Sequence, residues 1–244
     1  MYQVKIKPEI YEKFPSFNAI VIYAKNISNQ PSSEYSSQKL NSIEQSKTKE
    51  LAKYNKLSEH PYIAAWRKVY SAFGAKPKKY HCSAEALLKR VLKGDSIPRI
   101  NYLVDIYNAI SMKYVIPIGG EDWDKLSSDL HLKFAEGTES FETYSGNEAQ
   151  NDSPLEGEVI YADSIGATCR RWNWRQSPRT ALTEKTMNAY FVLEILPPTD
   201  LGILKNAAAE LCAEIKLLST DAEIKVEYLS NNSAEEVRLM PHNR

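Results

Sequence analysis

The sequence feature that most limits the fold is an almost unbroken apolar run, Phe-Asn-Ala-Ile-Val-Ile-Tyr-Ala, at residues 17–24. The run is rich in β-branched and aromatic residues and does not alternate with polar ones, which predicts a strand buried on both faces of its sheet. Such a strand needs other layers packed on both faces. A chain of 244 residues supplies them, because it buries roughly 70–75% of the surface that its unfolded form exposes.

The other segments indicate helices grouped between strands. Residues 2–6 alternate and predict a short first strand. Later strands of one sheet are expected at 158–162, 167–172 and 188–195, with a further strand at 223–229. Helices are expected at 39–56, from Pro61 to Gly74, at 83–93, at 101–114 and at 200–219. Strands on either side of a helical block, without regular βαβ alternation, predict an α+β fold in which a mixed sheet packs against helices.

We expect a single domain over residues 1–244. The polar residues 26–38 indicate a mobile loop. Ser83 is expected to be the N-cap of the helix that follows it, and Gly94 to occupy the position after its last turn. Along the chain, the domain is expected to consist of N-terminal strands (1–25), a polar loop with a surface helix (26–58), a core (59–229) and a loose tail (230–244).

Cysteines and histidines show no pattern typical of a metal site or a disulfide. Cys82, Cys169 and Cys212 are far apart and the four histidines lack ligand spacing, so we expect neither. The common nucleotide-binding, nucleophile-elbow and zinc-protease motifs are absent, so no cofactor is expected. No run of 18 or more apolar residues occurs, which predicts a cytoplasmic protein without a membrane partner.

Charge is distributed unevenly although 31 basic residues balance 31 acidic ones. Residues 61–100 carry nine basic side chains against two acidic ones, and residues 121–163 carry twelve acidic against two basic. One interpretation is that these segments meet in the fold and neutralise each other. The other is a phosphate-binding track, to which Lys76, Lys78 and Lys79 would belong.

The helix expected at 101–114 carries two polar residues of interest. Leu103, Ile106, Tyr107, Ile110 and Tyr114 follow the spacing of a buried stripe. Asp105 and Asn108 therefore fall on the opposite face with Asn101 and Met112, three residues apart, where they either converge on a ligand or hydrogen-bond the adjoining loop. After Pro117, Gly119 and Gly120 predict a turn with close backbone approach beside the carboxylates of Glu121 and Asp122.

The segment Arg-Arg-Trp-Asn-Trp-Arg at 170–175 alternates aromatic and basic side chains. In a strand, Arg170, Trp172 and Trp174 would lie on one side and Arg171, Asn173 and Arg175 on the other. The tryptophans either belong to the core, with the arginines paired to the acidic stretch, or form a wall for a nucleotide base or an aminoacyl group. The four polar side chains of this segment would be hard to supply with hydrogen-bond partners in a core. We therefore expect the segment to lie at the wall or the mouth of a pocket.

These motifs resemble a known domain. Val-Asp-Ile-Tyr-Asn at 104–108, Pro117 with the Gly-Gly-Glu-Asp turn, and Arg-Arg-Trp-Asn-Trp-Arg downstream are similar to the tRNA-editing (B-three/B-four) domain of the phenylalanyl-tRNA synthetase beta subunit, and to free-standing bacterial proteins built from it. The resemblance covers residues 60–198. Asn108 matches a residue that lines the editing pocket. Tyr107 replaces a threonine and Gly119 a histidine, so specificity for misacylated tyrosine does not carry over.

The resemblance implies a tRNA-binding aminoacyl-tRNA deacylase that acts in trans; a non-catalytic tRNA- or RNA-binding module is the alternative. Ester hydrolysis needs a positioned water, groups that hold the amino acid, and donors to the oxyanion. Asn108 and Asp105 are the expected catalytic residues. The expected substrate-binding residues are Tyr107, Gly119, Gly120, Glu121, Asp122, Arg171, Trp172, Asn173 and Trp174, and the expected tRNA-binding residues are Lys76, Lys78, Lys79, Arg170 and Arg175.

Overall fold

Strand β2 (Asn18–Lys25) lies inside a four-stranded antiparallel sheet of order β11-β2-β10-β3 in the computed structural model, which describes residues 2–146 and 148–231. Its neighbours are β11 (Glu223–Ser230) and β10 (Ala189–Ile195), and β3 (Ile118–Asp122) pairs with β10. All residues of β2 except the first and the last are buried. The strand predicted from the apolar run is therefore confirmed.

A second, five-stranded sheet has the order β1-β4-β7-β8-β9. Strand β1 (Val4–Ile6) runs parallel to β4 (Leu130–Phe134), and the other pairs are antiparallel. The remaining strands of this sheet are β7 (Val159–Ala162), β8 (Ala167–Arg170) and β9 (Arg175–Gln176), and a separate hairpin consists of β5 (Glu142–Ser145) and β6 (Glu148–Asn151).

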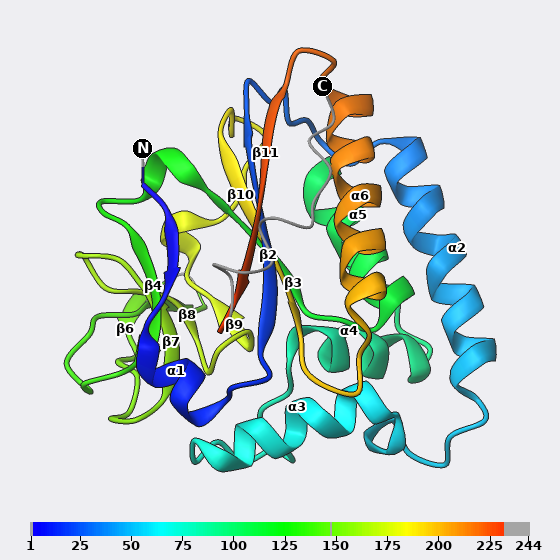
Figure 1. Cartoon of the computed structure of the whole chain (residues 1–244). Helices are drawn as coiled ribbons and strands as arrows, with labels where there is room; N and C mark the ends of the chain where they lie inside the picture. Colours follow the sequence, from blue (N-terminus) through cyan, green and yellow to red (C-terminus); the bar gives the residue numbers. More distant parts are fainter. Residues whose placement is uncertain (1, 147, 232–244) are drawn as a thin grey trace.

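Six helices complete this part of the chain: α1 (Pro8–Lys13), α2 (Glu34–Leu51), α3 (Pro61–Ala72), α4 (Ser83–Leu92), α5 (Tyr102–Tyr114) and α6 (Leu201–Leu218). Helices α5 and α6 lie against one side of the four-stranded sheet and α2 lies outside them, while the five-stranded sheet lies on the other side (Figure 1). This arrangement confirms the predicted α+β class with a mixed sheet. No helix in the described ranges is long and apolar enough to cross a bilayer.

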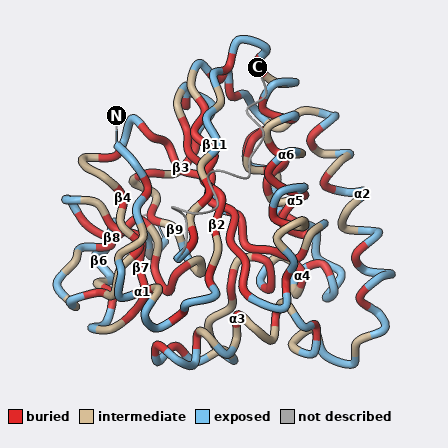
Figure 2. The backbone as a smooth tube through the Cα atoms, viewed as in Figure 1, coloured by how far each residue is buried: buried red, intermediate tan, exposed pale blue. Residues whose placement is uncertain are grey.

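Two large clusters of buried residues share the four-stranded sheet as their common wall, and the central strands of this sheet are coloured as buried along most of their length (Figure 2). Ile20, Ile22 and Phe191 face α5 and α6, whereas Val21, Tyr190 and Val192 face the five-stranded sheet. Successive residues of a strand point to opposite faces. Strands β2 and β10 therefore contribute apolar residues from one face to the first cluster and from the other face to the second.

Several local expectations are corrected. The strands expected in one sheet are divided between two, with β7 and β8 in one and β10 in the other. Helix α2 begins at Glu34 because Ser33 and Ser36 form a capping box, so the expected loop ends earlier than 38. Cys82 precedes α4 and Ser83 is its first helical residue, whereas Gly94 has the expected positive φ of 87°. Most of the expected tail, 232–244, lies outside the described residues.

Candidate active site

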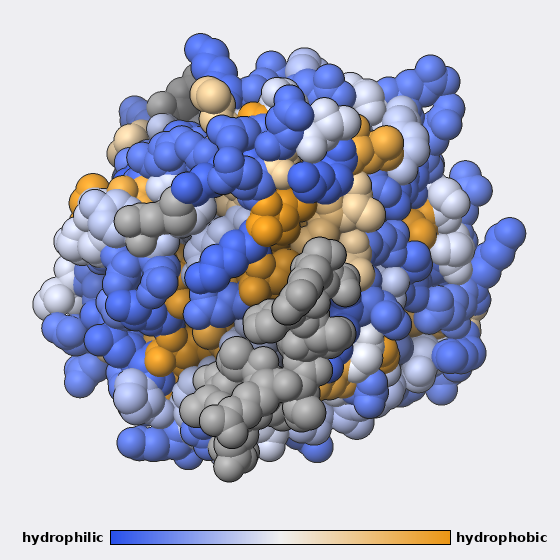
Figure 3. Space-filling model, turned by 45° about the horizontal axis from the view of Figure 1, so that its top comes forward, coloured by the Kyte–Doolittle hydropathy of each residue, from blue (hydrophilic) through white to orange (hydrophobic). Residues whose placement is uncertain are grey.

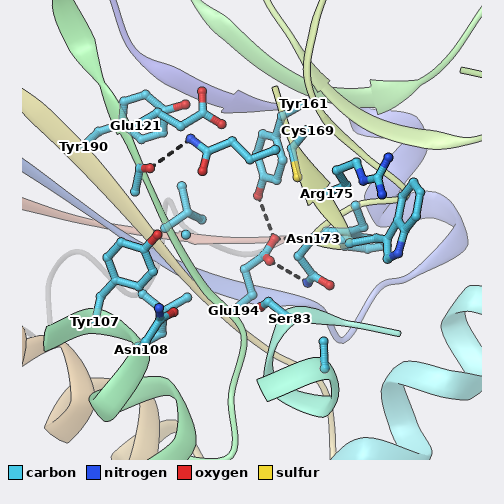
Figure 4. Close-up of a pocket in the computed structure, with 18 of the residues that line it drawn as sticks. Ser83, Tyr107, Asn108, Glu121, Tyr161, Cys169, Asn173, Arg175, Tyr190 and Glu194 are labelled. Carbon is cyan, nitrogen blue, oxygen red and sulfur yellow. Dashed lines mark hydrogen bonds between the residues drawn. The ribbon is translucent and has the colours of Figure 1, made fainter. Parts of the chain in front are cut away.

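A pocket of about 250 Å³ lies where the two sheets meet the first turns of α4 and the middle of α5 (Figure 4). Ala86, Leu87, Ile118 and Val192 supply apolar lining. The polar residues that line it are Ser83, Tyr107, Asn108, Glu121, Tyr161, Asn173, Arg175, Gln176, Tyr190 and Glu194. An apolar cavity with a few convergent polar groups is the usual form of a site for a small molecule or part of one.

The two glycines expected in a turn belong instead to strand β3. Gly120 pairs with Phe191, and a Cβ on Gly120 would lie 2.6 Å from Cδ1 of that ring. Gly119 is exposed, and a Cβ there would meet no atom within 4 Å. The lack of a side chain is therefore required by core packing at Gly120, whereas at Gly119 it leaves the pocket open.

The ladder between β3 and β10 directs the amides of these glycines differently. Glu194 N donates to Pro117 O over 3.1 Å, and hydrogen-bonded pairs alternate along an antiparallel ladder. The Gly119 amide is therefore directed to Val192, and the Gly120 amide points away from β10. Gln176 Nε2 donates to Gly120 O over 3.0 Å on that outer edge.

Glu121 is one of two buried carboxyl groups in the pocket. It follows Gly119 on the same face of β3 and is only 6% exposed. Burial raises the pKa of Glu121 to about 7. The hydroxyls of Tyr190, Thr180 and Thr168 and the charge of Arg179 lower this pKa, but their combined effect is smaller than that of burial. Near neutral pH, this carboxyl group is therefore poised between its charged and neutral forms.

Glu194 is the other buried carboxyl group, and protein donors hold it. Tyr161 Oη and Trp172 Nε1 each donate to its Oε1 over 2.7 Å, and Asn173 Nδ2 donates to its Oε2 over 2.8 Å. Burial raises its pKa, and these three donors act in the opposite direction. Glu194 thus joins β10 to β7 and to the turn after β8.

The thiol of Cys169 lines the same pocket. Burial raises its pKa well above the ordinary value, and the neighbouring carboxylates Glu121 and Glu194 raise it further. A thiol in such surroundings stays neutral, and the thiolate is the nucleophilic form. Within residues 2–146 and 148–231, no group of three or more histidine, cysteine, aspartate or glutamate side chains is placed to hold a metal ion.

Helix α5 brings Tyr107 and Asn108 to the pocket but not Asp105. Asp105 is fully buried on another side of the helix, where Ser36 Oγ donates to Oδ2 over 3.1 Å and Ile100 N donates to Oδ1 over 3.1 Å. The expected convergence of Asp105 and Asn108 on one ligand is therefore wrong. For Asp105, the bond from Ile100 N is the bond to the adjoining loop that the alternative expected.

The face of α5 expected to be exposed is largely covered. Met112 is fully buried, and Asn101 is 2% exposed and caps the helix by accepting from Val104 N. Helix α2 packs along this face. Because α2 supplies a second partner, α5 is buried around most of its circumference. The side chains of Asn101 and Asp105 make internal hydrogen bonds there.

Asp122 also differs from its expected role. It is adjacent to Glu121 in an extended strand, so its side chain lies on the opposite face of β3. Asp122 Oδ2 accepts from Thr186 Oγ1 over 2.7 Å and its Oδ1 accepts from Asp124 N over 3.2 Å. These bonds close the turn after β3, and Asp122 does not line the pocket.

The segment 170–175 is a turn rather than a continuous strand. Strand β8 ends at Arg170, and Arg171 and Trp172 have positive φ values of 47° and 66°, in the left-handed region that bulky residues rarely adopt. The alternation expected from a strand is therefore broken. Trp172 turns into the core, fully buried with its ring edge-on to Phe17 and Trp66.

Two arginines of this segment, Arg170 and Arg171, form ion pairs in the protein interior. Arg170 is 2% exposed and places Nε and Nη2 each 2.9 Å from the carboxylate of Glu158, with Asp152 on its Nη1. Arg171 lies 3.4 Å from Glu158 and is also buried. The expected roles of Arg170 in tRNA contact and of Arg171 in the pocket wall are corrected. The acidic stretch neutralises both, as the alternative interpretation required.

Trp174 and Arg175 lie at the mouth of the pocket, next to the basic loop. Trp174 contacts Tyr80 edge-on at 4.9 Å between ring centres, and the Arg175 guanidinium lies 4.7 Å from the Trp174 ring. Lys79 Nζ lies 5.2 Å from the Tyr80 ring. Lys76, Lys78, Lys79 and Arg175 are all exposed.

Sequence reasoning did not identify Glu194, Tyr190, Tyr161, Thr168, Thr180, Cys169, Gln176 or Ser83 as site residues. Glu194 carried a usable signal, because it is the single charged residue in the otherwise apolar strand Ala189–Ile195. A charge inside a buried strand needs partners, so it indicates a site or an internal network. Tyr190 and Thr168 carried no such signal, because tyrosine and threonine are common in ordinary strands.

Comparisons with known proteins agree with the predicted resemblance. No curated protein sequence matches the chain. Among solved structures, an N-terminal fragment of the phenylalanyl-tRNA synthetase beta subunit from Pyrococcus horikoshii is similar, with 11% sequence identity and a TM-score of 0.45. That match covers 91% of this chain and 50% of the fragment, so the chain spans about half of the fragment's length. The B3/4 domain model matches residues 65–216, and because this is more than half of the sequence, the chain belongs to the B3/4 domain family.

Proposed function

We propose that this protein is an aminoacyl-tRNA deacylase that acts in trans on mischarged tRNA in the cytoplasm. The observation that carries the proposal is the pocket between the two sheets. It combines apolar walls with a buried carboxyl group, Glu121, and with an amide side chain, Asn108, and its mouth adjoins the lysines of the loop at 76–79. A pocket favours binding of an aminoacyl group, whereas a flat basic face would favour a module that only binds RNA.

The proposed chemistry uses a water molecule as the nucleophile. Asn108 orients the water, and Glu121 holds an amino group of the substrate. The Gly120 amide, which points away from β10, donates to the oxyanion that develops on the ester carbonyl. The neutral state of the Cys169 thiol supports a water-based reaction over attack by a thiolate.

The proposed tRNA contacts follow from what lies around the pocket mouth. Trp174 offers an aromatic face beside Arg175, and the terminal base of a tRNA can stack on such a face. The exposed Lys76, Lys78 and Lys79 lie next along the surface and are suited to phosphates. In this arrangement the 3′ end carries its amino acid into the pocket while the backbone stays on the basic loop.

The test is to incubate the protein with a panel of aminoacyl-tRNAs and to follow loss of the ester. We expect at least one to be hydrolysed, and Asn108→Ala to reduce that rate severely without loss of stability. Asn206→Ala, on the exposed side of α6, is the matched control. If Asn108→Ala hydrolyses the best substrate at the rate of the unchanged protein, Asn108 does not belong to the reacting site.

The same panel tests the alternative of a non-catalytic tRNA- or RNA-binding module. In that case the protein would bind tRNA with a strong dependence on salt concentration and would leave every ester intact. The exposed lysines of the loop are compatible with a binding module as well as with a deacylase. The pocket is the feature that a binding module would not need.

A further inference from the structure

Four buried oxygen atoms, on and beside the pocket-lining residue Glu121, have no well-aligned hydrogen-bond partner. They are Oε2 of Glu121, Oη of Tyr190, and Oγ1 of Thr168 and Thr180. Each of the four residues is at most 6% exposed. Glu121 and Tyr190 are paired across β3 and β10 and line the pocket, and the hydroxyls of all three neighbours act on the Glu121 carboxyl group.

Buried polar atoms in folded proteins are nearly always paired. The three hydroxyls are close enough to Glu121 to lower the pKa of its carboxyl group, but none of them forms a hydrogen bond of good geometry with it, so a further donor is needed to complete the set. A ligand with several hydrogen-bond donors supplies one. Hydroxyls both donate and accept, but an ionised carboxylate only accepts. The group that satisfies such a set best is an ammonium, which has three donors and no acceptor.

The charge around Glu121 supports a cation. Arg179, the cation that acts on Glu121, is paired with Asp163 over 2.8 Å and 3.0 Å, and Lys125 donates to Ala181 O. Within the described ranges, Glu121 has no ion pair closer than 4 Å. When ionised, it therefore presents negative charge to the pocket without a protein counter-ion. A ligand ending in a carboxylate or phosphate would be repelled.

Glu194 cannot serve the same purpose. Tyr161 and Asn173 already donate to its two oxygens (Figure 4), and Trp172 also donates to Oε1. The pocket therefore offers one free carboxyl group and can bind one amino group by ion pairing. If a substrate has two amino groups, the one that is not paired with Glu121 must lie at the mouth of the pocket.

The position of Glu121 indicates which amino group is bound. Gly119 and Glu121 lie on the same face of β3, and two residues of a strand span roughly 7 Å. Gly119 is exposed and open, whereas Glu121 is buried. Apolar side chains, including Leu87 and Val192, line the same pocket. This distance suits an aliphatic stem of three or four carbons with its ammonium at the inner end.

We propose that the pocket selects aminoacyl groups whose side chain is an aliphatic stem ending in an ammonium, such as lysyl or ornithyl, with Glu121, Tyr190, Thr168 and Thr180 as the ammonium subsite. This proposal rests on the proposed deacylase function for its substrate. Recognition of the amine itself can be measured without any reaction. Tyr190, Thr168 and Thr180 act as specificity residues in this scheme, because they contact only the distal end of the side chain.

The test compares lysinamide with norleucinamide by calorimetry at about pH 8. The two share an α-amino group and a stem, and only lysinamide has a side-chain ammonium. We expect lysinamide to bind on the order of tenfold more tightly or better, the usual effect of a charge-assisted hydrogen bond. Equal affinity, including no detectable binding of either amide, overturns the proposal.

Substitutions then test which residues cause the preference for lysinamide. Glu121→Gln keeps the shape of the side chain and is expected to remove the preference for lysinamide. Thr168→Val, which removes one hydroxyl, is expected to weaken it. Glu184→Gln, at an exposed acidic residue, is the control and should retain the full preference. A preference that persists in Glu121→Gln overturns the assignment even if lysinamide binds well.

Deacylation of lysyl-tRNA and norleucyl-tRNA then separates the two proposals. Preference for lysinamide without hydrolysis of any aminoacyl-tRNA supports the ammonium subsite and rejects the deacylase. Hydrolysis of neutral aminoacyl-tRNAs, together with equal binding of the two amides, supports the deacylase and rejects the ammonium subsite. Faster hydrolysis of lysyl-tRNA, lost in Glu121→Gln, supports both.

Discussion

Trp172 donates a 2.7 Å hydrogen bond from its indole nitrogen to Oε1 of Glu194. This bond connects the turn after β8 to strand β10 across the floor of the pocket. Because Tyr161 and Asn173 also donate to Glu194, the carboxyl group is held on both oxygens. Trp172 is therefore both the largest fully buried side chain and a hydrogen-bond partner that fixes the pocket floor.

The two tryptophans of the turn should respond differently to truncation. We expect Trp172→Ala to lower the free energy of unfolding by about 3–5 kcal/mol, the usual cost of removing a large buried aromatic side chain. Trp174→Ala should cost clearly less, because Trp174 is only partly buried, and should raise the apparent KM for aminoacyl-tRNA. Urea denaturation and steady-state kinetics measure both. Equal losses of stability would place Trp174 in the core as well.

The adjacent glycines of β3 provide a matched pair. Gly120→Ala should destabilise the protein by roughly 1–3 kcal/mol, because the new Cβ would lie 2.6 Å from the Phe191 ring and the core must shift. Gly119→Ala should leave stability unchanged within about 0.5 kcal/mol, since nothing lies within 4 Å. Thermal denaturation distinguishes them. Destabilisation by Gly119→Ala as large as that by Gly120→Ala would contradict the placement of these residues.

Asp105→Ala tests the corrected role of that residue. Its carboxylate accepts hydrogen bonds from Ser36 Oγ and Ile100 N in the protein interior. Removing it leaves buried donors unpaired, so we expect a loss of about 1–3 kcal/mol in unfolding free energy. Substrate affinity per folded molecule should change little. A stable Asp105→Ala protein with a large loss of activity would instead return Asp105 to the active site.

The exposed lysines should govern the salt dependence of tRNA binding. Reversing the charge of Lys76, Lys78 and Lys79 together is expected to weaken affinity and to flatten the dependence of log K on log salt, because fewer counterions are released. Reversal of Lys205, exposed on α6, serves as a single-site control for charge reversal away from the mouth. Filter binding at several salt concentrations measures both quantities. Unchanged affinity and slope in the folded triple variant would show that these lysines do not contact tRNA.

Glu121 should make stability depend on pH in a defined direction. Its pKa is about 7 in the folded protein against an ordinary value of 4.5, so between these pH values the folded state holds a proton that the unfolded state has lost. Its contribution to stability is therefore full below about pH 4.5 and is lost as pH rises to about 7. Relative to Glu121→Gln, the unchanged protein should lose up to about 3 kcal/mol over this range.

Denaturation of both proteins at about pH 5 and about pH 8 checks this prediction. The charged and titratable groups that act on Glu121 are Arg179 in the loop before β10, Tyr190 on β10, Cys169 on β8 and Tyr107 on α5. Burial keeps the three titratable neighbours neutral in this range, so the difference between the two proteins reports on Glu121 itself. A constant difference from pH 5 to pH 8 would mean that its pKa is not raised.

Local sequence determined much of the chain. The apolar run at 17–24 specified a strand with cores on both faces, Pro61 marked the first residue of α3, and Gly94 marked the end of α4. These signals depend on neighbouring residues along the chain, such as the fixed φ of proline and the freedom of glycine to take positive φ. The motifs at 104–108 and 170–175 were also sufficient to indicate the family.

Tertiary structure alone decided which polar residues face the pocket. The stripe of α5 indicated one buried face but not that α2 covers another, so Asp105 is internal and Asn108 is not. Likewise, Arg170 could be recognised as structural only once Glu158, twelve residues away, lay beside it. Periodicity reports the burial of one face of an element. Which groups cover the other face depends on contacts between residues far apart in the chain, and those contacts form only when the sheets and helices pack.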